Sequence, residues 1–377
     1  MRTRLSALVP PESPPLSGKP PFLIGVLEGE GVGPEVVRAS LQVLSALESG
    51  GSPRFEIRRG GAIGLEAEAR AGTPLSRELE LFCDEVFSRG GAILAGAGGG
   101  RFVYELRRRF DLFCKIVPLR VCEELIAENR LKRQTVEGVD IVLIREGSAG
   151  VYQGTWGFEH SAEGRRATHS FAYSEAQVRR VVEAAARIAA ARLRKLLVVV
   201  KDGGMPSVSE LWRECGSAAA REAGVACSFA NVDLAAYLLI QHARDLDVVV
   251  APNLFGDVLA DLGAVLLGGR ALSFSGNFSA AGAAVYQTNH GGALDLAGTD
   301  RANPVGQIFS AAMLLRESFG LAGDAARIED AVARVWRAGW RTADLAGSGH
   351  RVVGCREMGE LVCEALAKPE ALFARAD

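Results

Sequence analysis

The chain has 377 residues, 48% of them hydrophobic and 23% charged, with a net charge of −2. Its length exceeds that of one ordinary domain, and its hydrophobic content indicates a well-buried globular protein. The near-neutral charge argues against nucleic acid as the main partner, and no apolar stretch is long enough for a membrane span. Seven scattered cysteines without a C-x-x-C pair indicate free thiols in the cytoplasm and argue against a zinc site.

The chain begins with a proline-rich segment, residues 1–21, which has six prolines and no continuous apolar core, so a disordered tail is expected. From Phe22 onward, short apolar runs alternate with segments of helical spacing. The short runs predict strands at 22–27, 92–95, 139–145, 195–200, 227–232 and 247–251. The helical segments are 35–47, 174–194, 207–223, 234–243, 304–319, 325–339 and 357–368. This order predicts an α/β protein with a mostly parallel central sheet.

The first predicted strand leads into a glycine-rich turn, residues 28–34, and then into a helix. A dinucleotide-binding fingerprint has the same setting, but this turn does not follow the G-x-G-x-x-G pattern. In addition, Glu28 and Glu30 lie where a pyrophosphate needs backbone N–H groups. A Rossmann-type cofactor site is therefore disfavoured.

The segment from Asp247 to Asp261 carries the strongest chemical signal. A buried strand is followed by a turn containing Pro252 and Gly256, and then by a helix on which Asp257 and Asp261 are four residues apart. Their carboxylates therefore lie on one face of the helix, one turn apart. The two negative carboxylates repel each other unless a cation lies between them. Their oxygen atoms are hard ligands, which suit Mg²⁺ or Mn²⁺. An acidic first turn that complements the helix dipole explains the same pair, so the pair alone leaves both interpretations open.

Five segments match, in order, the motifs of one enzyme family. They are Gly29–Val36 (G-D-G-I-G-P-E-V), Leu106–Phe113 (L-R-K-x-x-D-L-[FY]), Val142–Gly154 (V-R-E-x-x-x-G-x-Y-x-G), Asn253–Asp261 (N-L-F-G-D-I-L-S-D) and His290–Pro304 (H-G-S-A-P-D-I-A-G-x-x-x-A-N-P). Together they resemble the β-decarboxylating dehydrogenases, a family that includes isocitrate, homoisocitrate, 3-isopropylmalate and tartrate dehydrogenases. The resemblance extends over almost the whole chain after the tail, and five motifs in family order exclude chance agreement.

The resemblance implies an isopropylmalate dehydrogenase-like fold of two α/β lobes, with the active site between the lobes and a homodimer that shares its active sites. Residues 22–120 and 260–377 would form the large, cofactor-binding lobe. Residues 121–259 would form the small lobe, which carries dimerisation and the substrate and metal contacts.

The resemblance also implies roles for charged residues. Asp257 and Asp261 would bind Mg²⁺ or Mn²⁺ together with Asp233 of the other subunit. Arg107 and Arg145 would hold the substrate carboxylates in bidentate fashion. These ligands imply a small-molecule substrate with more than one acidic group.

The loop 290–303 would hold the adenosine of the cofactor through His290, Gly291, Asp295 and Asn303. In the family, the acid at the position of Asp295 accepts hydrogen bonds from the ribose hydroxyls. Because a carboxylate repels a 2′-phosphate, NAD is expected in preference to NADP.

The chemistry of the family requires two proton-transfer groups. Tyr152 would protonate the carbon that remains after loss of CO₂, with Asp233 and a lysine completing the catalytic set. The family lysine precedes a helix in a K-A-N motif, which this chain replaces by Lys201, Asp202 and Gly203. One alignment register places Asp202 at the lysine position and another restores Lys201, which we favour.

Other positions depart from the family pattern. The second substrate arginine is Val117, and Lys115 and Arg101 are the candidates to replace its charge. The glutamate before the loop histidine is Gln287, and a small-residue segment has become Ser273–Asn277. These changes predict a specialised substrate and not isocitrate or 3-isopropylmalate. The expected function is NAD- and metal-dependent oxidation of a malate-like 2-hydroxy acid with β-decarboxylation, and the alternatives are oxidation without decarboxylation or a catalytically silent subunit.

Overall fold

The computed structural model describes residues 4–9 and 20–368, so most of the predicted tail lies outside the described residues. The part that is described, residues 4–9, packs on the body of the protein. Its 3₁₀ turn η1 spans Ser6–Leu8, the backbone N–H of Ser6 donates to the Glu317 carboxylate at 2.8 Å, and Val9 is 1% exposed. This anchoring departs from the disordered tail expected from composition, because composition does not reveal which buried partner a short segment can reach.

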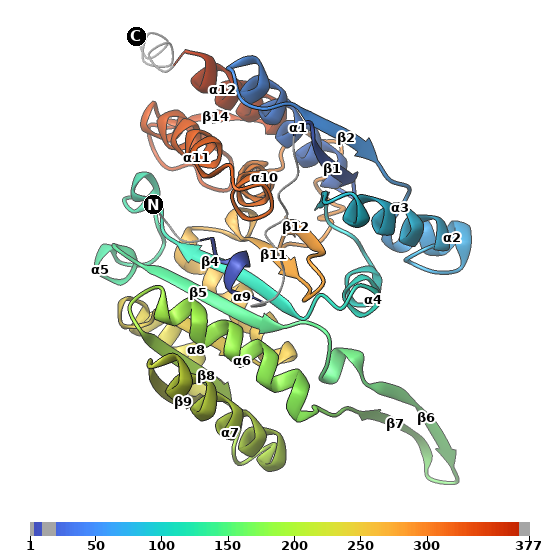
Figure 1. The fold of residues 1–377 in the computed structure, drawn as a ribbon. Helices are drawn as coiled ribbons and strands as arrows, with labels where there is room; N and C mark the ends of the chain where they lie inside the picture. Colours follow the sequence, from blue (N-terminus) through green and yellow to red (C-terminus); the bar gives the residue numbers. More distant parts are fainter. Residues whose placement is uncertain (1–3, 10–19, 369–377) are drawn as a thin grey trace.

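A ten-stranded sheet runs through the middle of the molecule in the order β2-β1-β3-β12-β11-β4-β5-β10-β8-β9 (Figure 1). Six of its nine neighbouring pairs are parallel. The three antiparallel pairs, β12–β11, β11–β4 and β4–β5, lie together at the centre. The predicted α/β class with a mostly parallel sheet is therefore confirmed.

The strands of this sheet are Phe22–Leu27 (β1), Phe55–Arg59 (β2), Ala92–Ala95 (β3), Cys114–Arg120 (β4), Asp140–Glu146 (β5), Lys195–Val200 (β8), Ala226–Asn231 (β9), Val248–Ala251 (β10), Phe274–Phe278 (β11) and Ala284–Thr288 (β12). Two small sheets pair Thr155–Ser161 (β6) with Gly164–Ser170 (β7), and Trp340–Thr342 (β13) with Arg351–Val353 (β14). The α-helices are Gly33–Ser49 (α1), Gly64–Ala71 (α2), Arg77–Ser88 (α3), Phe102–Arg109 (α4), Arg133–Val136 (α5), Glu175–Ala190 (α6), Pro206–Ala223 (α7), Val232–Gln241 (α8), Asn253–Leu267 (α9), Val305–Glu317 (α10), Ala322–Arg337 (α11) and Cys355–Ala367 (α12). Further 3₁₀ turns are Glu123–Leu125 (η2), Val151–Gln153 (η3), Ala243–Asp245 (η4) and Arg270–Leu272 (η5).

The strands found from sequence are the apolar ones. β1 and β10 are buried at every position, as expected for strands that are covered on both faces. In contrast, β11 contains Ser275, Gly276 and Asn277, and β2 alternates between partly buried and exposed residues, so neither gives a continuous apolar run. The helices divide into two groups: α1 packs against α12 and α10 beside β1, and α6 packs against α7 beside β8 (Figure 1). The division into lobes at 120/121 and 259/260 stays a prediction.

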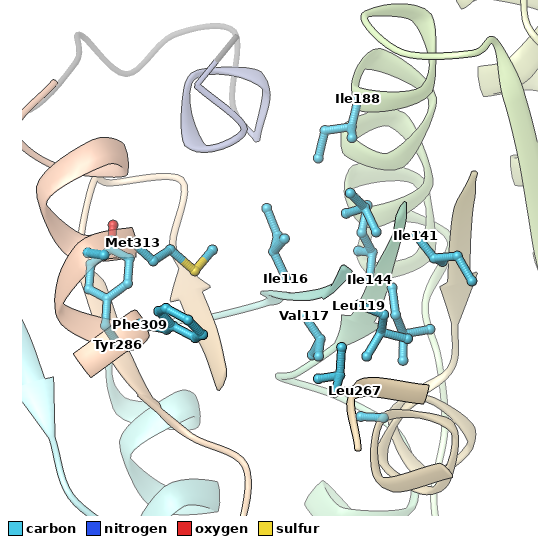
Figure 2. Packing of buried hydrophobic residues seen from close by; sticks show 14 of the residues in the cluster. Ile116, Val117, Leu119, Ile141, Ile144, Ile188, Leu267, Tyr286, Phe309 and Met313 are labelled. Carbon is cyan, nitrogen blue, oxygen red and sulfur yellow. The ribbon is translucent and has the colours of Figure 1, made fainter. Parts of the chain in front are cut away.

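Val117, which stands at the position of the missing family arginine, lies on β4 and is 0% exposed. It belongs to the main hydrophobic core together with Leu119 and Leu267, and its side chain is directed toward α9 (Figure 2). On the same face of β4, Lys115 precedes it by two residues. The face of β4 on which the family arginine is missing therefore has a lysine instead, two residues earlier in the strand.

The hairpin β6–β7 extends away from the body as an arm (Figure 1). Most of its residues are exposed, and it carries the large apolar side chains Trp156 and Phe158, which are 54% and 61% exposed. A two-stranded hairpin of this kind has too little buried surface to be stable by itself. The arm is thus a candidate for contact with another protein chain.

Candidate active site

Three of the four antiparallel central strands, β11, β4 and β5, bring polar side chains into one row. Asn277 on β11 is paired with Lys115 on β4, and Lys115 is paired in turn with Arg145 on β5. Directly paired residues project to the same face of a sheet, so the three side chains are neighbours. Arg107, on α4, joins the row because its Nε donates to Oδ1 of Asn277 at 3.2 Å. We call Arg107, Lys115 and Arg145 the cation cluster.

Arg145 is held by the first turn of α9. Its Nε donates to Oδ1 of Asn253 at 2.9 Å, and its Nη1 forms an ion pair with Asp257. Gly256 permits this close approach, since a Cβ there would lie 2.7 Å from the Cβ of Arg145. The remaining nitrogen, Nη2, is buried and has no hydrogen-bond partner among the described residues. This charged N–H donor is therefore unsatisfied in the single chain, and an acceptor on a bound ligand would satisfy it.

Lys115 is 4% exposed, and within the described part of the chain its ammonium forms no hydrogen bond or ion pair. Burial, and then the charges of Arg107 and Arg145, lower its pKa well below the usual range. Arg107 is 3% exposed, and burial followed by the charge of Arg145 likewise lowers its pKa. Burying several cations close together destabilises the folded state unless an anion binds beside them and compensates their charge. The cluster therefore has the character of an anion-binding site.

Tyr152 lies in η3, next to the same helix. Its hydroxyl donates to Oδ2 of Asp257 at 2.9 Å, and burial, followed by the Asp257 charge, raises its pKa. The ring of Tyr104, on α4, lies 4.9 Å from the ring of Tyr152. The structure thus brings Arg145, Asp257 and Tyr152 together from β5, α9 and η3. Burial would raise the pKa of Asp257, but Arg145 and Lys115 outweigh it, so the pKa is lowered and the carboxylate is ionised.

Asp261 follows Asp257 by one helical turn, and its Oδ2 accepts from Nη2 of Arg270 at 2.7 Å. Asp233 lies elsewhere in this chain, at the start of α8, where its Oδ1 is 2.9 Å from Nζ of Lys201. Within the described residues, Asp233 does not join the α9 pair in a three-ligand group. One chain therefore supplies two of the three predicted metal ligands in one place.

Lys201 and Asp202 follow the end of β8 and point to different partners. Lys201 pairs with Asp233, whereas Asp202 is held by Nε and Nη2 of Arg213 at 2.9 and 2.6 Å. The pKa of Asp202 is lowered by this arginine. The side chain of Asp202 thus forms its ion pair with a residue of the neighbouring helix α7.

The loop 290–303 packs on the glycine-rich turn near the start of the chain. The backbone N–H of Val32 donates to Gly292 O at 2.8 Å, and any side chain at Gly31, whose φ is +62°, would collide with the same carbonyl oxygen. Nε2 of His290 is buried and has no hydrogen-bond partner in the part of the chain that the structure describes, while Gly291 and Asp295 are exposed.

Asn303 closes this loop in a different way. Its Oδ1 accepts from Val305 N at 3.0 Å at the start of α10, and its Nδ2 donates to Asp344 at 3.1 Å. Its side chain is thus used to fix the loop to the helix. Asp295 forms no hydrogen bond or ion pair within the described residues.

Two residues of the site were not predicted. Asn277 anchors Arg107, and Asn253 anchors Arg145 while its Nδ2 donates to Ala149 O at 2.7 Å. In β11 the other residues are small or aromatic, so the amide of Asn277 was the signal in the sequence that could have indicated a role in the site. Arg101, proposed to replace the missing arginine, has other partners: its Nη2 donates to Tyr152 O at 3.1 Å and its guanidinium lies over the Trp156 ring.

Comparison with known proteins identifies the family of the chain. The family model for isocitrate/isopropylmalate dehydrogenase matches residues 23–362. The chain belongs to this family. A 3-isopropylmalate dehydrogenase from Synechococcus sp. (strain JA-3-3Ab) is 37% identical over 375 residues, covering 95% of this chain and 97% of the relative. The 3-isopropylmalate dehydrogenase of Geobacillus kaustophilus is 36% identical, covering 90% and 94%.

Solved structures of the family have the same fold. The crystal structure of isocitrate dehydrogenase from Methylococcus capsulatus superposes with a TM-score of 0.80 at 28% identity, covering 92% of this chain and all of the other. The predicted family and its isopropylmalate dehydrogenase-like α/β fold are thereby confirmed. Among the described residues, no helix is both long and apolar enough to cross a lipid bilayer. A surface hollow of about 320 Å³ lined by residues 134–135 and 241–245 contains none of the residues described above.

Proposed function

We propose that this family member is an NAD- and Mg²⁺- or Mn²⁺-dependent dehydrogenase that oxidises and decarboxylates a malate-like 2-hydroxy acid. The observation that carries the proposal is the cation cluster beside Asp257. Three buried cationic side chains, among them Arg145 with a buried Nη2 that has no partner among the described residues, adjoin the ionised carboxylate of Asp257 on α9. A substrate with two carboxylates and a metal-binding hydroxyl satisfies both halves of this arrangement.

The residues present fit a divalent ion. Asp257 and Asp261 offer carboxylate oxygens on one face of α9, the type of ligand that Mg²⁺ and Mn²⁺ prefer. In the single chain, Arg145 and Arg270 place positive charge beside these two carboxylates. Asp233 of a second subunit would supply a further oxygen.

The residues of the loop 290–303 fit NAD. The exposed, unpartnered carboxylate of Asp295 is suited to accept hydrogen bonds from ribose hydroxyls, and the buried Nε2 of His290 has a free hydrogen-bonding position. When bound, NAD⁺ supplies a hydride acceptor and the divalent ion lowers the pKa of the substrate hydroxyl. Everything else in the reaction is done by the side chains of the chain itself.

The reaction assigns one task to each group. Arg107, Arg145 and Lys115 would bind the substrate carboxylates and fix C2 for hydride loss. Lys201 would take the hydroxyl proton, which leaves a 2-oxo acid. The carboxylate β to the new carbonyl then leaves as CO₂, and its bonding electron pair stays on the carbon that Tyr152 protonates. Burial and the Asp257 charge keep Tyr152 protonated and able to donate, as its raised pKa indicates.

A homodimer would complete the site. Both α8 and α9 have large apolar side chains on their exposed surfaces; they are Leu234, Tyr237, Leu254, Val258 and Val265. α8 and α9 are in contact, and the same helices carry Asp233, Asp257 and Asp261. Apolar faces of this kind usually mark an interface, and two-fold pairing is the commonest arrangement. Joining two copies here would bring Asp233 and Lys201 of one copy toward Asp257 of the other.

The cation cluster and the relatives both bear on the choice of substrate. Val117 motivated the expectation of a specialised substrate, but Lys115 supplies a third cation on the same strand face. Moreover, the relatives above carry the name 3-isopropylmalate dehydrogenase. 3-Isopropylmalate is therefore the first compound to test, followed by other 2-hydroxy di- and tricarboxylates and their phosphonate analogues.

The proposal is tested by following NADH and CO₂ separately in the presence of Mn²⁺. Equal amounts of both products are expected from at least one substrate. NADH without CO₂ would favour oxidation without decarboxylation. No NADH from any compound would favour the silent-subunit alternative.

Cofactor choice gives a quantitative prediction. NAD⁺ should be preferred over NADP⁺ by tenfold or more in kcat/KM, a difference of about 1.4 kcal/mol, because Asp295 would face the 2′-phosphate. Asp295→Asn should reduce this preference by raising activity with NADP⁺ and lowering it with NAD⁺. Equal use of the two cofactors by the natural protein would contradict the assigned role.

Replacing Lys115 should separate binding from stability. Lys115→Met removes a buried cation that has no ion-pair partner among residues 4–9 and 20–368, so the melting temperature should rise. The same change should raise KM for the substrate by about 10- to 100-fold, because a charge-assisted hydrogen bond contributes about 1.5–3 kcal/mol. Lys115→Arg, which keeps the charge, is the matched control. An unchanged KM in Lys115→Met would remove this residue from the substrate site.

A further inference from the structure

The base of the arm contacts the turn that carries Tyr152. The guanidinium carbon of Arg101 lies 4.3 Å from the centroid of the Trp156 ring, and the His169 ring lies 5.8 Å from the same ring. Arg101 precedes α4, whereas Trp156 and His169 come from β6 and β7. One aromatic side chain thus contacts two cationic or ionisable side chains from separate parts of the chain.

Both of these side chains also hold the η3 turn. Nη2 of Arg101 donates to Tyr152 O at 3.1 Å, and Nε2 of His169 lies 2.6 Å from Val151 O. Because a carbonyl oxygen can only accept, Nε2 of His169 carries the hydrogen in this contact. Two consecutive carbonyl groups of η3 are therefore bound by the two side chains that contact Trp156.

The side chain of Tyr152 is restrained from the other direction by α4. Tyr104 packs against its ring at 4.9 Å, and Tyr104 O accepts from Nε2 of Gln153 at 2.9 Å. The hydroxyl of Tyr152 is then directed to Asp257. The orientation of Tyr152 depends on the position of η3, and that position depends on donors at the base of the arm.

We propose that Trp156, through Arg101 and His169, is a positioning residue for Tyr152 and couples the arm to the active site. This inference rests on the proposed function in one respect: the role of Tyr152 as the proton donor is part of that proposed function. The indole ring restricts the rotamers of the two side chains that bind η3, and such support keeps a catalytic group in its productive geometry.

The exposure of Trp156 makes this coupling sensitive to what covers the arm. The side chain is 54% exposed in the single chain, and a guanidinium–indole contact becomes stronger when water is removed from it. Covering the arm with a second copy of the chain would therefore tighten the hold of Arg101 on Tyr152. Trp156 would in this way link the association of subunits to the position of the proton donor, Tyr152.

The test uses the full-length protein labelled with ¹³C at the ζ carbon of tyrosine. The chain has 5 tyrosines, so the signals are few, and Tyr152→Phe identifies the one of interest. Trp156→Leu should shift or broaden the Tyr152 signal and leave those of Tyr173 and Tyr286 in place. Trp156→Phe, which keeps an aromatic ring, should restore much of the natural signal.

Phe158→Leu is the matched control. Phe158 lies two residues further along the same strand, on the same face, and is 61% exposed. It contacts Arg165 at 4.8 Å, and within the described residues no ring contact joins it to Arg101, His169 or Tyr152. This variant should leave the Tyr152 signal unchanged, which separates positioning from a general effect on the arm.

Kinetics provide the second readout. Trp156→Leu should lower kcat about tenfold with little change in KM, because the proton donor and not the carboxylate-binding cluster is displaced. A Tyr152 signal unchanged by Trp156→Leu, or changed equally by Phe158→Leu, would overturn the proposal. Since the NMR signal does not require turnover, an inactive natural protein would contradict the proposed function and leave this test valid.

Discussion

Asp257→Asn is expected to abolish NADH formation and to remove any rise in melting temperature caused by Mn²⁺. The carboxylate is the point at which the proposed metal site, Arg145 and Tyr152 meet. The amide is isosteric but uncharged, so it is a poor ligand for a hard cation and a weaker partner for Arg145. A ligand that binds the native state stabilises it, so the melting curve with and without Mn²⁺ reports metal binding directly.

Tyr152→Phe is the control that separates these roles. It removes one partner of Asp257 and the proposed proton donor but no metal ligand, so turnover should fall while the Mn²⁺-dependent rise in melting temperature persists. If Asp257→Asn turned over substrate at the natural rate, the metal assignment would be wrong. A rise in melting temperature with Mn²⁺ that survives in Asp257→Asn would lead to the same conclusion.

The parts of the fold that were predicted from sequence are those with a local signal. β1, β8 and β10 are apolar runs buried on both faces, and α9 begins directly after a Pro-containing turn. Two strands of the antiparallel centre, β11 and β12, gave no such signal. β11 and β12 carry polar residues whose burial depends on pairing with β4 and β3, which are far away in sequence. Pairing of this kind is decided by tertiary structure, and no window of local sequence contains it.

Contacts between strands far apart in sequence also explain which features of the site were found only in the structure. The spacing of Asp257 and Asp261 is a local property of one helix, so it could be read from sequence. The neighbourhood of Asn277, Lys115 and Arg145 is a property of three strands in register. Sequence comparison could name Lys115 as a candidate for the charge lost at Val117, but it could not show that this lysine is buried between two arginines without an ion-pair partner.

Lys201→Met is expected to lower kcat by about 10² or more with little change in melting temperature, because a general base contributes on this scale. The side chain is 39% exposed and its one ion pair, with Asp233, is on the surface of the single chain, so its loss costs little stability. Asp202→Asn is the matched control and should have a mild effect, since Asp202 is bound to Arg213. Natural turnover in Lys201→Met would refute the proposed base.

Mixing two inactive variants tests whether Lys201 acts in the other subunit. In a hybrid dimer of Lys201→Met and Asp257→Asn, one site would combine the intact Asp257 of the first chain with the intact Lys201 of the second, and the other site would lack both. Random reassociation of equal amounts of two-fold dimers should therefore restore about one quarter of the natural activity. A site built within a single chain would recover nothing, because every chain in the mixture carries one of the two lesions. The separation of Lys201 and Asp233 from the α9 carboxylates in one chain favours recovery. Activity that stays at the level of the separate variants would show that Lys201 and Asp257 do not meet across subunits.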